Sequence, residues 1–202
     1  MVNIAVFFDP VERKNKVLRP EITDFFQPQQ IFCTFGGSEH NVFGLLEAPK
    51  LFDFVTDIHN DYDQRRQFVP YQLIEKTLER AMRGALTNLS RLREFYSCPI
   101  TQICTPPAFS SIDDTTVLPT VFQGRLQLGI TPAPIRQKLH YVHTRITRFH
   151  CERLGVNFLP PPETATDSQG YLRRELWTKD PTHGNREYGK LVLNQIMEIY
   201  DV

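Results

Sequence analysis

The segment Gln30-Ile31-Phe32-Cys33-Thr34-Phe35-Gly36-Gly37-Ser38-Glu39-His40-Asn41 changes from a strand-like to a helix-like pattern at its two adjacent glycines. The apolar run before the glycines predicts a buried strand. The residues after them suit a short helix over residues 38–46, with Ser38 and Glu39 in its first turn. A strand–helix turn of this kind aims backbone N–H groups at an anion. The simpler interpretation is a structural turn in which Ser38 caps the helix.

Short apolar runs and long amphipathic stretches alternate along the rest of the chain. Further strands are expected at residues 2–8, 99–104 and 156–159, and helices at residues 19–26, 71–96, 133–154 and 185–200. The three long helices are predicted from apolar stripes: Ile74, Leu78, Ala81, Ala85, Leu89 and Leu92; Ile135, Leu139, Val142, Ile146 and Phe149; Tyr188, Leu191, Val192, Ile196 and Ile199. Gly155 is expected to end the second of them. Residues 47–70 and 105–132 look like loops. The alternation predicts one α/β domain over residues 1–202 with a parallel sheet.

The composition is that of an ordinary globular protein. Of 202 residues, 41% are apolar, and 23 Lys and Arg residues balance 23 Asp and Glu residues. This balance provides no net field for a nucleic acid or an anionic membrane. No apolar run approaches the roughly 18 residues needed to cross a bilayer, and no signal peptide is recognisable. The four cysteines lack Cys-x-x-Cys spacing, so reduced structural thiols and a cytoplasmic location are expected.

A second motif, Asp180-Pro181-Thr182-His183, lies just before the last predicted helix. A carboxylate three residues before a histidine can fix the imidazole tautomer and stabilise its cation, as a general base for a hydroxyl nucleophile requires. The alternative is a structural turn in which the aspartate caps the helix. Chemistry in parallel α/β sheets sits at the carboxyl ends of the strands. The Gly36-Gly37 turn, the Pro106-Pro107 loop and the segment after Leu159 are therefore expected on one rim of the sheet.

Together these motifs resemble the SGNH/GDSL hydrolase superfamily over roughly residues 19–200. The resemblance implies a three-layer α/β/α, flavodoxin-like fold and the hydrolysis of acyl esters, with a small-molecule or glycan ester as substrate. It implies His183 as general base and Asp180 as its orienting carboxylate. Gly36, Gly37, Ser38 and Glu39 fall on the family's Gly-x-Asn-Asp block of oxyanion donors, with Ser38 in place of the asparagine. No metal and no organic cofactor is implied.

The front of the chain departs from the family pattern, because no Gly-Asp-Ser nucleophile block occurs there. The closest match is Val6-Phe7-Phe8-Asp9-Pro10, in which proline stands in the serine's place. The stretch between Asp9 and Gln30 is too short for the expected helix and second strand. The chain is therefore expected either to lack early strands or to have lost hydrolysis. The second hypothesis is a non-catalytic module that binds a glycan or acyl ligand on the same fold.

Other reactive side chains are assigned plainer roles. Ser110 and Ser111 are alternative nucleophiles in a loop on the predicted rim, but loop serines are usually solvated. Cys104 ends a strand without the electropositive surroundings that a reactive thiolate needs. The helical histidines His140, His143 and His150 are expected to flank the apolar stripe and face water. An acidic surface loop, not a metal site, is the interpretation of Asp57, His59, Asp61 and Asp63.

Overall fold

The main sheet of the protein is parallel throughout. The computed structural model describes residues 4–5, 28–113 and 115–200. In this part of the chain the main sheet has four strands in the order β1 (Ile4–Ala5), β2 (Gln30–Cys33), β5 (Ile100–Ile103) and β6 (Asn157–Leu159). Ile4 pairs with Gln30, Ile31 with Ile100 and Thr101 with Asn157. The predicted helix at residues 19–26 and the Phe8-Asp9-Pro10 segment lie outside the described residues.

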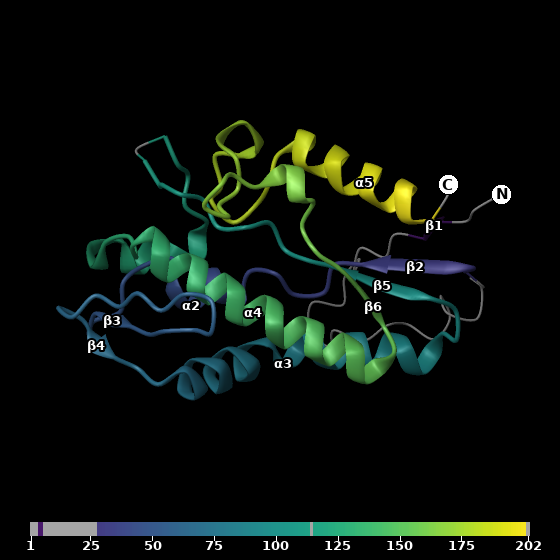
Figure 1. Ribbon diagram of the computed structural model, residues 1–202, viewed down its shortest axis with the longest axis horizontal. Coiled ribbons are helices and arrows are strands. Elements are labelled where there is room, and N and C mark those ends of the chain that lie inside the picture. Colours follow the sequence, from purple (N-terminus) through teal and green to yellow (C-terminus); the bar gives the residue numbers. More distant parts are fainter. Residues whose placement is uncertain (1–3, 6–27, 114, 201–202) are drawn as a thin grey trace.

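Helices cover both faces of this sheet (Figure 1). Successive strand residues point to opposite faces: Ile31 joins a core cluster with α3 (Tyr71–Phe95) and α4 (Ala133–Leu154), whereas Phe32 packs with α5 (Arg186–Tyr200). The result is a three-layer α/β/α arrangement, which confirms the predicted fold class. No helix in the described residues combines the length and apolarity that a bilayer crossing requires.

The short helix α2 (Glu39–Gly44) packs closely against α4. Gly44 permits this approach, because a Cβ there would lie 2.1 Å from Leu139 Cδ1. Phe54, the first half of α3 and residues of α4 from Ile135 to Ile146 form a further core cluster beside α2. The predicted end of α4 is confirmed, since Gly155 takes a left-handed conformation with φ 62°.

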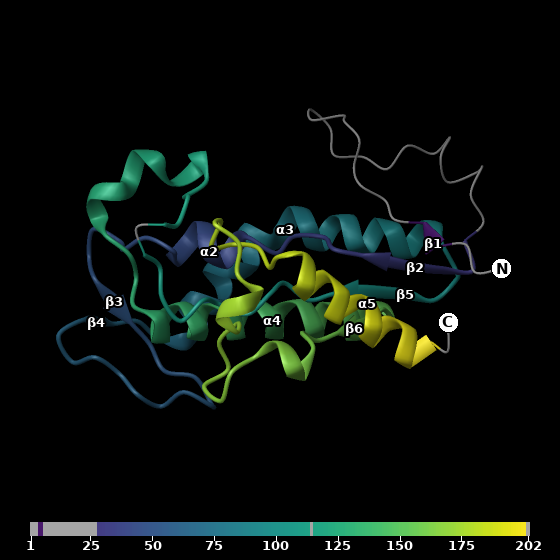
Figure 2. The same cartoon turned by 90° about the horizontal axis from the view of Figure 1, so that it is seen from above.

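The two segments expected to be loops contain short regular elements. Residues 47–70 hold a parallel pair, β3 (Phe52–Asp53) and β4 (Gln67–Phe68). Residues 105–132 include a 3₁₀ segment, η1 (Thr120–Leu128). Two shorter 3₁₀ turns, η2 (Glu163–Ala165) and η3 (Arg174–Leu176), precede α5. Strands of two residues are too short to show a periodic pattern, so the sequence could not predict them. Figure 2 shows β3, β4 and η1 at the end of the molecule toward which the main strands point.

Several residues of the predicted apolar stripes are exposed in the structure and do not belong to the core. On α3, Met82 is buried and Ala81 is exposed. Phe149 on α4 is 61% exposed and Ile199 on α5 is 56% exposed. The buried face of α4 also follows the row 139, 143, 147 and 151, because α2 packs against α4 and Cys151 belongs to the core cluster that contains Ile31 and Leu89. A row with four-residue spacing drifts around the helix, and Phe149 therefore lies outside it.

Candidate functional site

The Asp180–His183 pair forms as the sequence predicts. His183 Nδ1 lies 2.8 Å from Asp180 Oδ2. The other carboxylate oxygen accepts hydrogen bonds from the Thr182 N–H at 2.8 Å and the Thr182 hydroxyl at 2.7 Å. The His183 side chain is 69% exposed, and its Nε2 forms no hydrogen bond within the described residues. The pair thus presents a free imidazole nitrogen to solvent while its other nitrogen is held.

The charge of Asp180 fixes the role of each imidazole nitrogen. Partial burial raises the pKa of Asp180, but the hydrogen bonds from Thr182 and His183 outweigh it, and the pKa lies below its ordinary value. The carboxylate is therefore ionised at neutral pH and accepts a proton carried on Nδ1. With Nδ1 protonated, Nε2 carries the lone pair that a general base needs.

The turn that carries the pair is firmly held at the start of α5. The Asn185 side chain accepts hydrogen bonds from the N–H groups of Glu187 and Tyr188, and so caps the helix. Its amide also donates to the Trp177 carbonyl at 3.2 Å. A Cβ at Gly184 would lie 2.6 Å from the Tyr188 ring, so this position needs glycine. These contacts limit the movement of His183 relative to the body of the domain.

The turn at residues 36–39 follows β2 and is tied to the end of β5. Gly36 and Gly37 have φ values of 76° and 116°, which favour glycine. The Thr105 hydroxyl donates to the Gly37 carbonyl at 2.9 Å, and the Gly37 N–H donates to Glu39 Oε2 at 2.8 Å. Glu39 therefore already occupies one of the amides expected to serve an oxyanion.

Ser38 differs from Gly37, because its donors are not occupied by another described residue. It precedes α2 at the N-cap position, but its side chain makes no capping hydrogen bond. Within the described residues neither its hydroxyl nor its N–H has a hydrogen-bond partner. Of the turn residues expected to face an oxyanion, Ser38 thus keeps both donors available.

A cluster of three histidines, of which His40 and His143 are buried and His140 is half-buried, lies directly behind this turn. Glu39 Oε2 is 3.1 Å from His143 Nε2 on α4. The His40 ring packs against the rings of His143 and His140, with centroids 4.9 and 5.3 Å apart. The expectation that His140 and His143 face water is wrong, because α2 covers this side of α4. The i, i+3 spacing of the two histidines was visible in the sequence, but no sequence signal indicated which helix covers them.

Burial and neighbouring charges set the protonation of the cluster. Desolvation lowers the pKa of His40 well below its ordinary value, and lowers that of His140 to about 4. Burial raises the pKa of Glu39, but hydrogen bonds from His143 and Gly37 prevail and hold it at about 2. At neutral pH the cluster therefore contains an ionised glutamate and two uncharged histidines, His40 and His140.

We expect the free energy of unfolding to fall as the pH drops from about 6.5 to about 4, and the slope should reflect His140. In this window the unfolded chain binds a proton on His140 that the folded chain refuses, because the folded pKa is about 4 and the ordinary value is 6.5. Each such histidine contributes a slope of up to about 1.4 kcal/mol per pH unit. Urea unfolding across this range should give a shallower slope for His140→Gln. Equal slopes for the variant and the wild type would contradict this account.

The remaining candidates take up structural positions. Ser110 and Ser111 are exposed, and Cys104 is buried with a thiol pKa raised to about 11 by desolvation. The exposed Asp57 carboxylate binds Tyr141 and Arg145 on α4, so this loop is a surface loop as expected. In the described part of the chain, no group of three or more His, Cys, Asp or Glu side chains could hold a metal ion.

The Asp180–His183 pair and the turn at residues 36–39 lie toward the same end of the sheet. The turn follows the carboxyl end of β2, and the pair precedes α5, which begins near that end (Figure 1). Among the described residues, however, no hydrogen bond or ion pair joins Asp180 or His183 to residues 36–39. The two motifs thus lie toward the same end of the sheet, and no hydrogen bond or ion pair in the described residues connects them.

Comparisons with known proteins find similarity in structure but no match in sequence. No family model matches the chain, and no curated protein matches it. A GDSL-like lipase from Bacteroides thetaiotaomicron is similar in structure, with a TM-score of 0.43 and 14% sequence identity. The alignment covers 85% of this chain and 63% of the lipase chain, so this chain spans less than two thirds of that protein.

Proposed function

We propose that this protein is a hydrolase of acyl esters of the SGNH type, with His183 as general base and Asp180 as its orienting carboxylate. The observation that carries the proposal is the 2.8 Å contact between His183 Nδ1 and Asp180 Oδ2, which leaves Nε2 free and exposed. The substrate class proposed is a small-molecule or glycan ester.

The proposed reaction proceeds through an acyl intermediate. A hydroxyl nucleophile gives its proton to His183 Nε2 and attacks the ester carbonyl, and the carbonyl oxygen becomes the oxyanion. Ser38 offers an N–H and a hydroxyl to that oxygen. The imidazolium then protonates the leaving alcohol, and water releases the acid by the reverse sequence. The family's nucleophile position falls on Val6–Pro10 by resemblance, where the sequence has no serine.

A non-catalytic binding module on the same fold is the second candidate. Two observations favour it: the chain has no Gly-Asp-Ser block, and Glu39 occupies the Gly37 amide. We further propose the cytoplasm as the location. The four cysteines are free thiols, which suits a reducing compartment.

Two measurements, labelling by a fluorophosphonate and an assay of ester hydrolysis, distinguish the hydrolase from the binding module. The hydrolase should release nitrophenol from short-chain aryl esters, or acetate from an acetylated oligosaccharide, and should form one covalent adduct. Mass spectrometry of the adduct would then identify the nucleophile. Thermal stabilisation by the oligosaccharide, with neither product nor adduct, would instead establish the binding module.

A further inference from the structure

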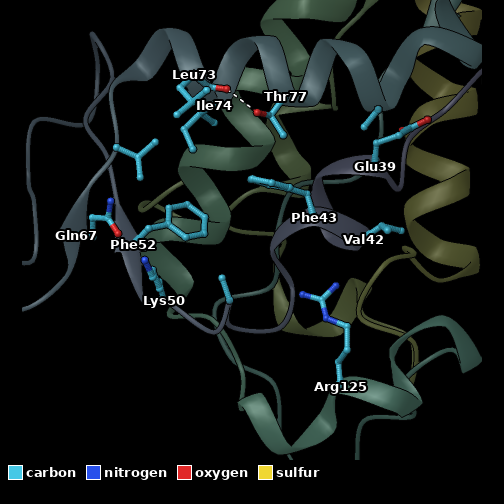
Figure 3. A pocket seen from close by; sticks show the side chains of 13 residues that line it. Glu39, Val42, Phe43, Lys50, Phe52, Gln67, Leu73, Ile74, Thr77 and Arg125 are labelled. Carbon is cyan, nitrogen blue, oxygen red and sulfur yellow. Dashed lines mark hydrogen bonds between the residues drawn. The ribbon is translucent and has the colours of Figure 1, made fainter.

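An apolar cavity of about 680 Å³ opens beside α2, outside the Asp180–His183 site. Its walls come from α2, the β3–β4 pair, the first half of α3 and η1 (Figure 3). Cavities of this size are typical of small-molecule sites. Two wall residues, Val42 and Leu73, are 42% and 57% exposed, so apolar surface is left open to solvent. The larger apolar side chains of the lining are Val42, Phe43, Phe52, Val69, Leu73 and Ile74.

Two cationic side chains border this apolar surface. Figure 3 shows Arg125 extending from η1 toward Phe43 and Val42, and Lys50 beside Phe52. In the described residues neither cation forms a hydrogen bond or an ion pair. Long cationic side chains can simply cover apolar surface with their stems. Here, however, two unpaired cations lie on the border of one open apolar cavity, and their charge complements an anionic group.

The acidic residue of the cavity does not neutralise these cations. Glu39 lines the cavity at the α2 end, but its Oε2 is bound by His143 at 3.1 Å and by the Gly37 N–H at 2.8 Å. The Glu39 carboxylate therefore interacts with the histidine cluster and its own turn, and not with Arg125 or Lys50. The cavity thus combines apolar walls with a positive border.

We propose that this cavity binds an unbranched acyl chain that carries an anionic head group, with the chain against the apolar walls and the head group beside Arg125 and Lys50. Burial of the chain supplies most of the affinity. The guanidinium and ammonium groups supply charge-assisted hydrogen bonds to a carboxylate or phosphate. This binding goes beyond ester hydrolysis, because it requires neither a nucleophile nor His183.

Titration with decanoate below its micelle concentration, followed by calorimetry, tests the site. We expect wild-type protein to bind decanoate and to bind decanol more weakly. Loss of both cations in Arg125→Ala/Lys50→Ala should weaken decanoate binding about tenfold, an effect that added salt should mimic. Leu73→Asp should also weaken it by about tenfold, because it places a carboxylate in the apolar wall.

Matched controls lie on other surfaces. Arg83→Ala removes an exposed arginine of α3 that is not part of the cavity lining, and Leu193→Asp alters a 59% exposed leucine on α5; neither should change decanoate affinity. A second experiment measures binding of the protein to vesicles that contain anionic lipids. Binding to vesicles without binding to decanoate would overturn the proposal, and so would equal decanoate affinity in all variants. Because binding is measured without turnover, these outcomes are independent of the esterase assay.

Discussion

His183→Ala is expected to lower kcat for aryl ester hydrolysis by about 10⁴–10⁶, because the base that activates the nucleophile is lost. Asp180→Asn should lower it by about 10⁴. The asparagine amide can donate to Nδ1, and a neutral imidazole would then carry its proton on Nε2, where it cannot accept the nucleophile's proton. Both changes remove transition-state interactions, so KM should change far less than kcat.

The structure provides a control for this comparison. His59 lies in the loop between β3 and β4, where its Nδ1 contacts the Thr56 hydroxyl at 3.2 Å. His59→Ala also removes one imidazole, but at a position outside residues 180–183. It should therefore leave kcat unchanged. Circular dichroism should show that the three variants are folded. Equal rates for His183→Ala and His59→Ala would contradict a catalytic role for His183.

The sequence predicted a contact between residues that are close along the chain, but it missed a contact between residues that are far apart. The Asp180–His183 contact joins residues three positions apart on one turn, so spacing alone predicts it. The Glu39–His143 contact joins residues 104 positions apart. It depends on how α2 packs across α4, and Gly44 permits that packing through the absence of a side chain. No local pattern encodes such a contact.

The same distinction holds for the fold. The buried strand at Gln30–Cys33 and the helix ended by Gly155 follow from apolar runs and a left-handed glycine, both local signals. The β3–β4 pair depends on backbone hydrogen bonds between short segments, such as Gln67 N–H to the Leu51 carbonyl at 2.9 Å. Side-chain periodicity cannot report these bonds. Likewise, a cation at position 138 of an amphipathic helix predicts exposure, yet Lys138 is among the fully buried residues.

Lys138→Met is expected to lower the free energy of unfolding by about 3–5 kcal/mol, because it leaves a buried carboxylate without its cation. Lys138 Nζ lies 3.0 Å from Asp53 Oδ1, and the two side chains are 1% and 4% exposed. Lys138 also donates to the Asp61 carbonyl at 2.5 Å, so it joins α4 to the loop after β3. Urea unfolding of the variant measures the loss.

The partner residue makes a double-mutant cycle possible. Asp53 accepts hydrogen bonds from the N–H groups of Phe54 at 2.7 Å and Asp63 at 2.9 Å, so an acceptor oxygen must remain. Asp53→Asn removes the charge but keeps one such oxygen. The Lys138→Met/Asp53→Asn double variant should therefore recover part of the stability lost in Lys138→Met, because no unpaired charge stays buried.

An exposed ion pair on α5 serves as the control for the buried Lys138–Asp53 pair. Lys190 pairs with Glu187 at 2.8 Å on α5, but both side chains are more than half exposed. Exposed pairs contribute at most about 1 kcal/mol, so Lys190→Met should change the free energy of unfolding by far less than Lys138→Met. Similar losses in the two methionine variants would show that the Asp53 carboxylate is solvated or protonated when Lys138 is absent. A large difference, reduced again in the double variant, would establish that desolvation of the charge makes this contact necessary.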